Sequence, residues 1–270
     1  MNILQSDRCA NCDRAVTAPG QKFCPDCGQP TPAHRIDWHF LGHELEHSVL
    51  HMDRGIFYSL KELMLRPGHL MRDYIEGRRA NQVKPLLLVM VSAAVVVLLG
   101  KYLLEGDLVG AASIQTSAGY VEGAGAGVGG SARAAASVKA AAPLTDWINT
   151  HLAVFTLMLL PFEAGAFWLA FKDRGLNYPE WLVISAFLTV QTFIFMAAAV
   201  LVQRWLPSAQ TWAVLFAFLY LLFSMIQYFQ GFSRWKTGLR AFLGFTLFTV
   251  ITSLIYASAG FVLAYISRQG

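Results

Sequence analysis

Five long apolar windows constrain this chain more than any other feature of its sequence. Crossing a hydrocarbon core of about 30 Å takes roughly 20 helical residues, and each window reaches that length. The chain is 55% hydrophobic and 14% charged, whereas soluble domains are about 25% charged. A soluble helical core is the alternative, but such cores rarely repeat apolar helices of this length. We therefore predict an all-α integral membrane protein with five transmembrane helices, at residues 85–104, 152–171, 181–203, 211–229 and 241–266.

Lysine and arginine gather in three segments before or between these windows. They are Arg54, Lys61, Arg66, Arg72, Arg78, Arg79 and Lys84 before the first window, Lys172 and Arg174 after the second, and Arg234, Lys236 and Arg240 after the fourth. Loops rich in these residues stay in the cytoplasm. An odd number of windows then predicts a cytoplasmic N-terminus and an extracytoplasmic C-terminus. The N-terminal sequence MNILQSDRCANC lacks the apolar stretch of a cleaved secretory signal, so none is expected.

Residues 105–146, between the first and second windows, are dominated by glycine, alanine and serine. Such a segment cannot bury enough apolar surface to offset the entropy lost on ordering. We therefore expect a flexible extracytoplasmic loop, within a transmembrane bundle that spans residues 83–270.

All four cysteines lie near the start of the chain as two CxxC pairs, which are Cys9 and Cys12, and Cys24 and Cys27. A CxxC turn can aim two sulfurs at one ion, so two turns supply the four ligands of a tetrahedral zinc site. About thirty residues with few large apolar side chains would be unfolded without a metal. We predict a head, residues 1–32, built as a small ribbon around structural zinc. A redox-active or disulfide-linked pair and an iron site are the alternatives.

Four histidines at strict four-residue spacing make a second candidate site: His39, His43, His47 and His51. On a helix they lie opposite an apolar stripe, and Asp37 is a plausible N-cap. Histidines four residues apart can chelate zinc, copper or nickel, and histidine titrates near physiological pH. The simplest interpretation is a solvated polar face, and a metal site and a pH sensor are the alternatives.

The string HELEH, from His43 to His47, also matches the His-Glu-x-x-His pattern of zinc proteases, with Glu44 in the place of the general base. No third ligand is identifiable, and short motifs match by chance. A membrane metalloenzyme is therefore the least favoured hypothesis, and no catalytic residue is predicted.

Residues 53–84 predict two further amphipathic helices before the first window. Pro67 cannot continue a helix, so the first of these helices should end near Arg66. Pro67 can instead begin the second helix, which should stop at Gly77. With the histidine helix they form a cytoplasmic collar, residues 33–82. Its basic residues would meet anionic lipid headgroups, each adding about 1 kcal/mol of attraction. A substrate phosphate site is the alternative.

The head and the collar together resemble a known family. FCPDCGQ, followed by HMDRGIFYSLKELMLRPGHLMRDYIEGRRANQVKP and several apolar windows, is similar to a widespread bacterial family of membrane proteins classed as a domain of unknown function. The shared series lies at Arg54–Gly55, Leu65–Gly68 and Tyr74–Arg79. The resemblance covers roughly the first hundred residues and implies a zinc-ribbon head and a location in the bacterial inner membrane. It implies no catalytic residue.

Glu163 lies inside the second window, two residues after Pro161. An ionisable residue at that depth is costly and marks a candidate functional site. Its candidate hydrogen-bond partners are Gln191, Gln227 and Gln230. Both a structural hydrogen bond and an ion pathway remain open.

These features favour an adaptor or sensor that uses the zinc head and the collar to recruit a cytoplasmic protein at the membrane surface. The alternative is a small transporter or channel with Glu163 in its pathway. No nucleic-acid partner is expected.

Overall fold

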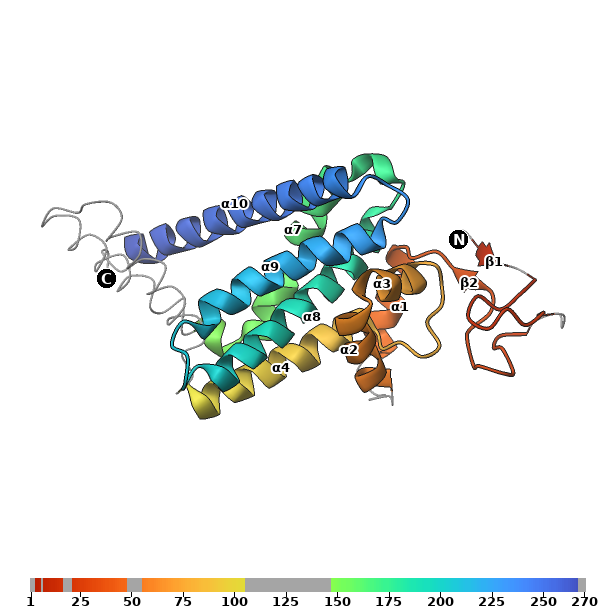
Figure 1. Ribbon diagram of the computed structural model, residues 1–270, viewed down its shortest axis with the longest axis horizontal. Helices are drawn as coiled ribbons and strands as arrows, with labels where there is room; N and C mark the ends of the chain where they lie inside the picture. The colour runs from red at the N-terminus through yellow and green to blue at the C-terminus, as the bar shows by residue number, and fades with distance from the viewer. Residues whose placement is uncertain (1–2, 6, 17–20, 48–54, 105–146, 267–270) are drawn as a thin grey trace, which may run out of the picture.

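The computed structural model describes residues 3–5, 7–16, 21–47, 55–104 and 147–266 (Figure 1). It describes their side chains except for those of 3–5, 43–47 and 260–266. The predicted loop at 105–146 lies outside the described residues.

Five long helices form the body of the described part of the protein. They are α4 (Pro85–Leu103), α7 (Leu152–Ala170), α8 (Tyr178–Val202), α9 (Ala209–Tyr228) and α10 (Arg234–Ile266). Each is long and apolar enough to cross a membrane. The prediction of an all-α protein with five candidate spans is therefore confirmed.

Three of these helices begin before their predicted windows. The first residues are Tyr178 in α8, Ala209 in α9 and Arg234 in α10, where 181, 211 and 241 were predicted. Hydropathy detects only the part of a helix that is apolar, and the first turns of α10 carry Arg234, Lys236 and Arg240. Helical hydrogen bonding continues through such charged residues. A helix can therefore begin several residues before its apolar window.

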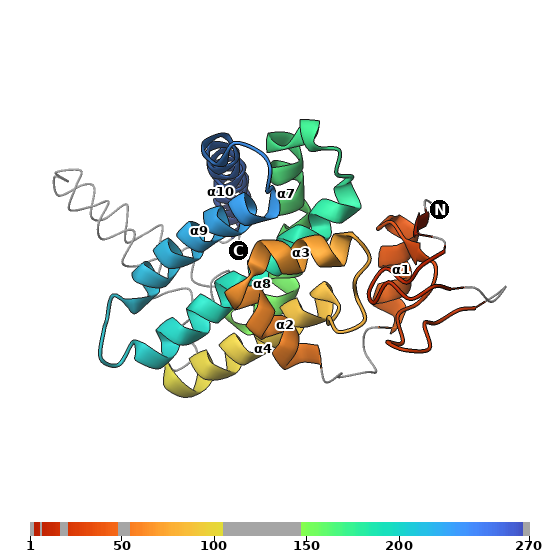
Figure 2. The same cartoon turned by 45° about the vertical axis from the view of Figure 1, so that its right-hand side comes forward.

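Helix α8 is the centre of the bundle and packs against α4, α7 and α9. Its apolar window is 67% buried, whereas that of α10 is only 11% buried. Trp181, Ile184 and Phe187 are buried completely in this core. Helix α10 lies at the edge beside α7 and α9, as the turned view shows (Figure 2). Most of the surface of α10 is therefore left for lipid or a partner.

Three shorter helices lie at one end of the bundle (Figure 1): α1 (Trp38–His47), α2 (Gly55–Leu65) and α3 (Pro67–Ile75). Asp37 caps α1 as expected, because its Oδ1 accepts a hydrogen bond of 2.8 Å from the Phe40 N–H. Helix α2 ends where Pro67 requires, and α3 is followed by Gly77 with a φ of 93°.

The head lies beyond these helices. Strands β1 (Ile3–Gln5) and β2 (Ala33–His34) pair antiparallel and bring its two ends together. The two CxxC loops lie between the strands in the sequence.

Candidate metal centre

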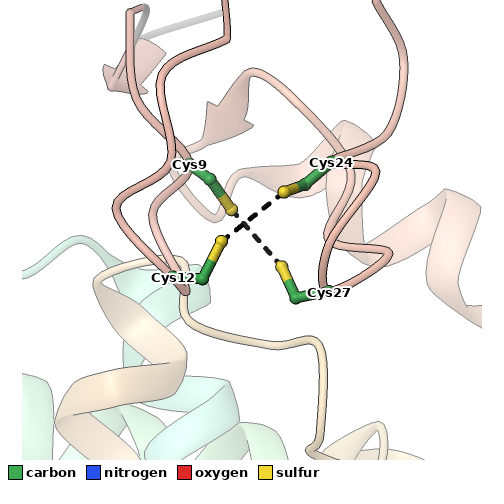
Figure 3. A group of neighbouring side chains, drawn as sticks. All are labelled: Cys9, Cys12, Cys24 and Cys27. Carbon is green, nitrogen blue, oxygen red and sulfur yellow. Dashed lines mark hydrogen bonds between the residues drawn. The ribbon is translucent and has the colours of Figure 1, made fainter.

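The four cysteines point at one centre from two separate loops (Figure 3). The Sγ atoms of Cys9 and Cys27 are 3.5 Å apart, as are those of Cys12 and Cys24. All four sulfurs lie within 4.8 Å of one another. Ligands at about 2.3 Å around a tetrahedral ion stand about 3.8 Å apart, whereas a disulfide needs about 2.05 Å. The cluster therefore fits a single metal ion, and all four cysteines are free.

The two loops are geometric copies of each other. In each, the N–H of the first cysteine donates a 2.8 Å hydrogen bond to the carbonyl five residues later, at Cys9 and at Cys24. The residue four positions after it is left-handed, with a φ of 60° at Asp13 and 71° at Gly28. The sequence indicated this conformation only at Gly28. Aspartate also tolerates it, because its short polar side chain can bond locally.

The thiols of this cluster differ in how readily they lose a proton. The backbone N–H of Cys27, helped by that of Asp26, lowers the pKa of the Cys24 thiol to about 7. The backbone N–H of Arg14 lowers the pKa of Cys12, but desolvation and the neighbouring thiols outweigh it and raise that pKa to about 12. Deprotonation is thus favoured at Cys24 and disfavoured at Cys12. A bound divalent ion removes this conflict, because metal ligation favours deprotonated sulfur.

One buried side chain, that of Gln29, ties the second cysteine loop to the collar. Gln29 accepts the Cys24 N–H through its carbonyl, at 2.8 Å, and its side-chain Oε1 accepts the Arg79 N–H at 3.0 Å. The Arg79 guanidinium lies over the rings of Phe40 and Tyr74, at 4.4 and 5.2 Å from their centroids. The second cysteine loop is therefore joined to α1 and α3 through Arg79.

A second tie joins the start of the collar to the bundle. Arg35 donates to both carboxylate oxygens of Glu180, at 2.6 and 2.9 Å, and to the Gly175 carbonyl at 2.8 Å. Asn177 and Glu180 form a capping box at the start of α8, and the Asn177 amide donates to the Ile36 carbonyl at 2.9 Å. Sequence reasoning missed this cluster. Its signal was the Asn-x-x-Glu spacing of a capping box.

Arg35→Ala is expected to lower the free energy of unfolding by about 2–3 kcal/mol. Glu180 is only 2% exposed, so its carboxylate would lose its cation in a buried place. Breaking a buried pair from one side costs about 3–5 kcal/mol, and the value here is lower because the Arg35 side chain is 34% exposed. Denaturant unfolding of the full chain in detergent measures it. Arg66→Ala, which breaks the exposed pair with Glu62, is the control and should change little. Equal effects of the two variants would contradict the importance of the Glu180 contact.

Helix α3 docks closely on the end of α9. The Gly68 N–H donates to Gln227 Oε1 at 2.8 Å, and a Cβ at Gly68 would lie only 2.5 Å from the Gln227 carbonyl carbon. Arg72 donates to the carbonyls of Gln227 and Tyr228 and to the side chain of Gln230. A cation thus neutralises the open carbonyls and the negative dipole end of α9.

The arginines expected at lipid headgroups are largely engaged within the protein. Arg72 and Arg79 make the contacts described above, and Arg78 bonds Asp73 and Glu76. These contacts explain why the collar is basic without invoking lipid. Contact with anionic headgroups, and the alternative of a phosphate site, remain predictions.

The histidine ladder lies mostly outside the described side chains. His39 is exposed on α1, His43 and His47 are described only as backbone, and His51 falls outside the described residues. The metal, pH-sensing and HELEH hypotheses therefore remain predictions.

On the apolar side of α1, Trp38 and Leu41 line a pocket of about 400 Å³ with side chains of α4, α7 and α8.

Glu163 is buried in the bundle, and its Oε2 accepts a hydrogen bond of 3.0 Å from the Thr189 hydroxyl of α8. This corrects the predicted partners, which were Gln191, Gln227 and Gln230. Gln191 instead accepts from Ser224 at 3.2 Å, and the other two glutamines bind α3 or its side chains. Helix rotation decides which polar groups meet, and hydropathy does not report rotation.

Comparison with known proteins adds one match. Residues 53–97 match a family model described as Protein of unknown function (DUF3667). No curated protein and no solved structure matches the chain. The matched range contains α2, α3 and much of α4, and it includes Gly68 and Arg72, through which α3 contacts α9. The protein is thus an α-helical membrane protein. Its residues 53–97, which include the part of α3 that contacts α9, are similar to a family of unknown function.

Proposed function

We propose that this protein is an adaptor or sensor of the bacterial inner membrane, in which a zinc-stabilised head and the collar present a rigid surface to a cytoplasmic protein. The observation that carries this proposal is the attachment of the metal loops to the bundle. Gln29 joins them to α3 through Arg79, and Arg35 joins the collar to Glu180. A head held in this way keeps a fixed orientation to the membrane.

The ion in the head is zinc, acting as a structural ion. Four thiolates in a tetrahedral set suit zinc, and they leave no coordination position for a substrate. The head therefore supplies shape and does no chemistry. This supports a role in binding over a role in catalysis.

The end of the bundle that carries the collar faces the cytoplasm. The collar, the connector from α7 to α8 and the connector from α9 to α10 all lie at this end (Figure 1). Arg240, in the second turn of α10, bonds Asp173 of the connector from α7 to α8. Basic residues concentrated at one end favour its cytoplasmic placement.

Phe23 is the candidate anchor for a protein partner. It directly precedes Cys24 and is 60% exposed, in the part of the chain that the metal orders. Exposed aromatic side chains on a rigid surface are common binding hot spots. Loss of the metal would abolish the fixed presentation of this ring.

A photoreactive phenylalanine analogue at position 23 tests the adaptor role in intact membranes. We expect a discrete adduct with a cytoplasmic protein, because the ring faces outward, and we expect the adduct to disappear with Cys24→Ser. The same analogue at Tyr102, exposed at the far end of α4, is the control and should not give this adduct. Adduct formation that is unaffected by Cys24→Ser, or adducts with lipid alone, would contradict the proposal.

A transporter or channel is the second candidate, supported by polar contacts inside the spans. Glu163 with Thr189 and Gln191 with Ser224 connect α7, α8 and α9. The Gln191 amide nitrogen is buried without a partner among the described residues. Glu163→Gln separates the two functions when crosslinking and flux are both measured. It leaves the position-23 adduct intact in an adaptor, whereas in a transporter it abolishes cation flux into reconstituted vesicles.

A further inference from the structure

A groove of about 560 Å³ runs between α9 and α10 at the end of the bundle that carries the collar. Its lining consists of Leu222, Ile226, Arg234, Trp235, Gly238, Leu239 and Phe242. Its volume falls within the range of about 300–1,000 Å³ that is typical of ligand sites. All but one of these residues are apolar or glycine, so the groove suits a hydrocarbon chain.

A glycine in the second turn of α10 lines the groove. A Cβ at Gly238 would lie 3.5 Å from Ile226 Cδ1, at ordinary contact distance, so a longer side chain there would occupy the groove. Leu239 and Phe242 are each about half exposed. Both helices are candidate membrane spans, so the open side of the groove faces hydrocarbon.

The charge at one end of the groove is unpaired. Arg234, in the first turn of α10, is exposed and has no hydrogen-bond or ion-pair partner among the described residues, and the same is true of Lys236. Other arginines at this end are engaged within the protein, namely Arg72, Arg174 and Arg240. No acidic residue lines the groove. A free guanidinium beside an apolar groove complements a molecule with an anionic headgroup and a hydrocarbon tail.

The position of Trp235 indicates the depth in the membrane at which such a headgroup would lie. Its side chain is 82% exposed next to Arg234. Exposed tryptophans at the ends of spans lie at the headgroup level of the bilayer. Arg234 is therefore at the height of lipid phosphates, which guanidinium groups bind with paired hydrogen bonds.

We infer that this groove binds an anionic phospholipid, with one acyl chain along Gly238, Leu239 and Phe242 and the phosphate on Arg234. The headgroup is anionic because the lining holds no carboxylate that could pair with the ammonium of a zwitterionic lipid.

Native mass spectrometry of the full-length protein tests the site, with the protein purified from nanodiscs that contain equal phosphatidylglycerol and phosphatidylcholine. The wild type should retain phosphatidylglycerol preferentially. Arg234→Gln should reduce its retention at least tenfold, because the phosphate loses its charged partner. Gly238→Leu should reduce it similarly by filling the groove. Leucine favours a helix more than glycine does, so this loss would not come from unfolding of α10.

Two variants serve as matched controls. Arg204→Gln removes one exposed charge at the opposite end of the bundle, and Leu243→Phe adds bulk to exposed α10 surface outside the groove. Both should retain the lipid as the wild type does. Equal retention by all variants, equal retention of both lipids, or a dimer cross-linked through Leu239→Cys, which would make a second copy the occupant, would overturn the inference.

Discussion

Cys24→Ser is expected to remove the metal from the purified full-length protein and to unfold the head. The sulfur of Cys24 is one of four that converge on the same point, and the head has almost no apolar core. Binding of structural zinc contributes about 10–16 kcal/mol in small domains of this kind, and that free energy is the folding free energy of the head. Elemental analysis should find about one zinc per chain in the wild type and almost none in the variant.

Asn11→Ser is the matched control, because it changes a residue between Cys9 and Cys12 that offers no sulfur. It should retain the metal. In Cys24→Ser, limited proteolysis should cut residues 1–32 while the helical signal of the bundle persists, since α4 and α7–α10 pack without the head. A full equivalent of zinc in Cys24→Ser would exclude the cysteine centre as its site. Zinc that remains after the head is removed would point to the histidine ladder.

Gly68→Ala is expected to separate α3 from α9 and to lower the free energy of unfolding by about 3–5 kcal/mol. The new Cβ would meet the backbone of Gln227 and Tyr228, which cannot rotate away as a side chain can. Overpacking costs about 1–3 kcal/mol, and the displaced helix also loses the Gly68 hydrogen bond and contacts of Arg72, each worth about 1 kcal/mol. Denaturant unfolding in detergent measures the loss.

Gly42→Ala in α1 provides the comparison. A Cβ at Gly42 meets nothing within 4 Å, so the same chemical change should leave stability unchanged or raise it by up to about 1 kcal/mol. If Gly68→Ala were as stable as Gly42→Ala, the close approach of α3 to α9 would not hold the collar.

The segment that matches the family of unknown function gains a physical interpretation from these contacts. Gly55 lies against the Asn81 carbonyl, which a Cβ would approach to 3.0 Å. Gly68 and Arg72 contact the end of α9, and the Arg79 N–H donates to Gln29, which follows the second cysteine pair. In the described part of this segment, Gly55 and Gly68 are therefore sites of close packing, and Arg72 caps α9.

The features that were predictable from the sequence are those that depend on near neighbours in the chain. Apolar length gave the five spans, Pro67 and Gly77 gave the limits of α3, and Asp37 gave the start of α1. The CxxC spacing identified which sulfurs could act together, because each pair lies on one turn. All of these signals are local, so they survive without knowledge of the packing.

The contacts that hold the head and the collar to the bundle came only from the tertiary structure. Arg35 and Glu180 are far apart in the chain, and the partner of Glu163 proved to be Thr189, which hydropathy could not select. The capping of α9 by Arg72 was likewise visible only in the structure. The sequence by itself determined that this chain forms a membrane bundle with a four-cysteine head. Only the packing decided how the two are joined, because helix rotation and close approach depend on every neighbouring side chain at once.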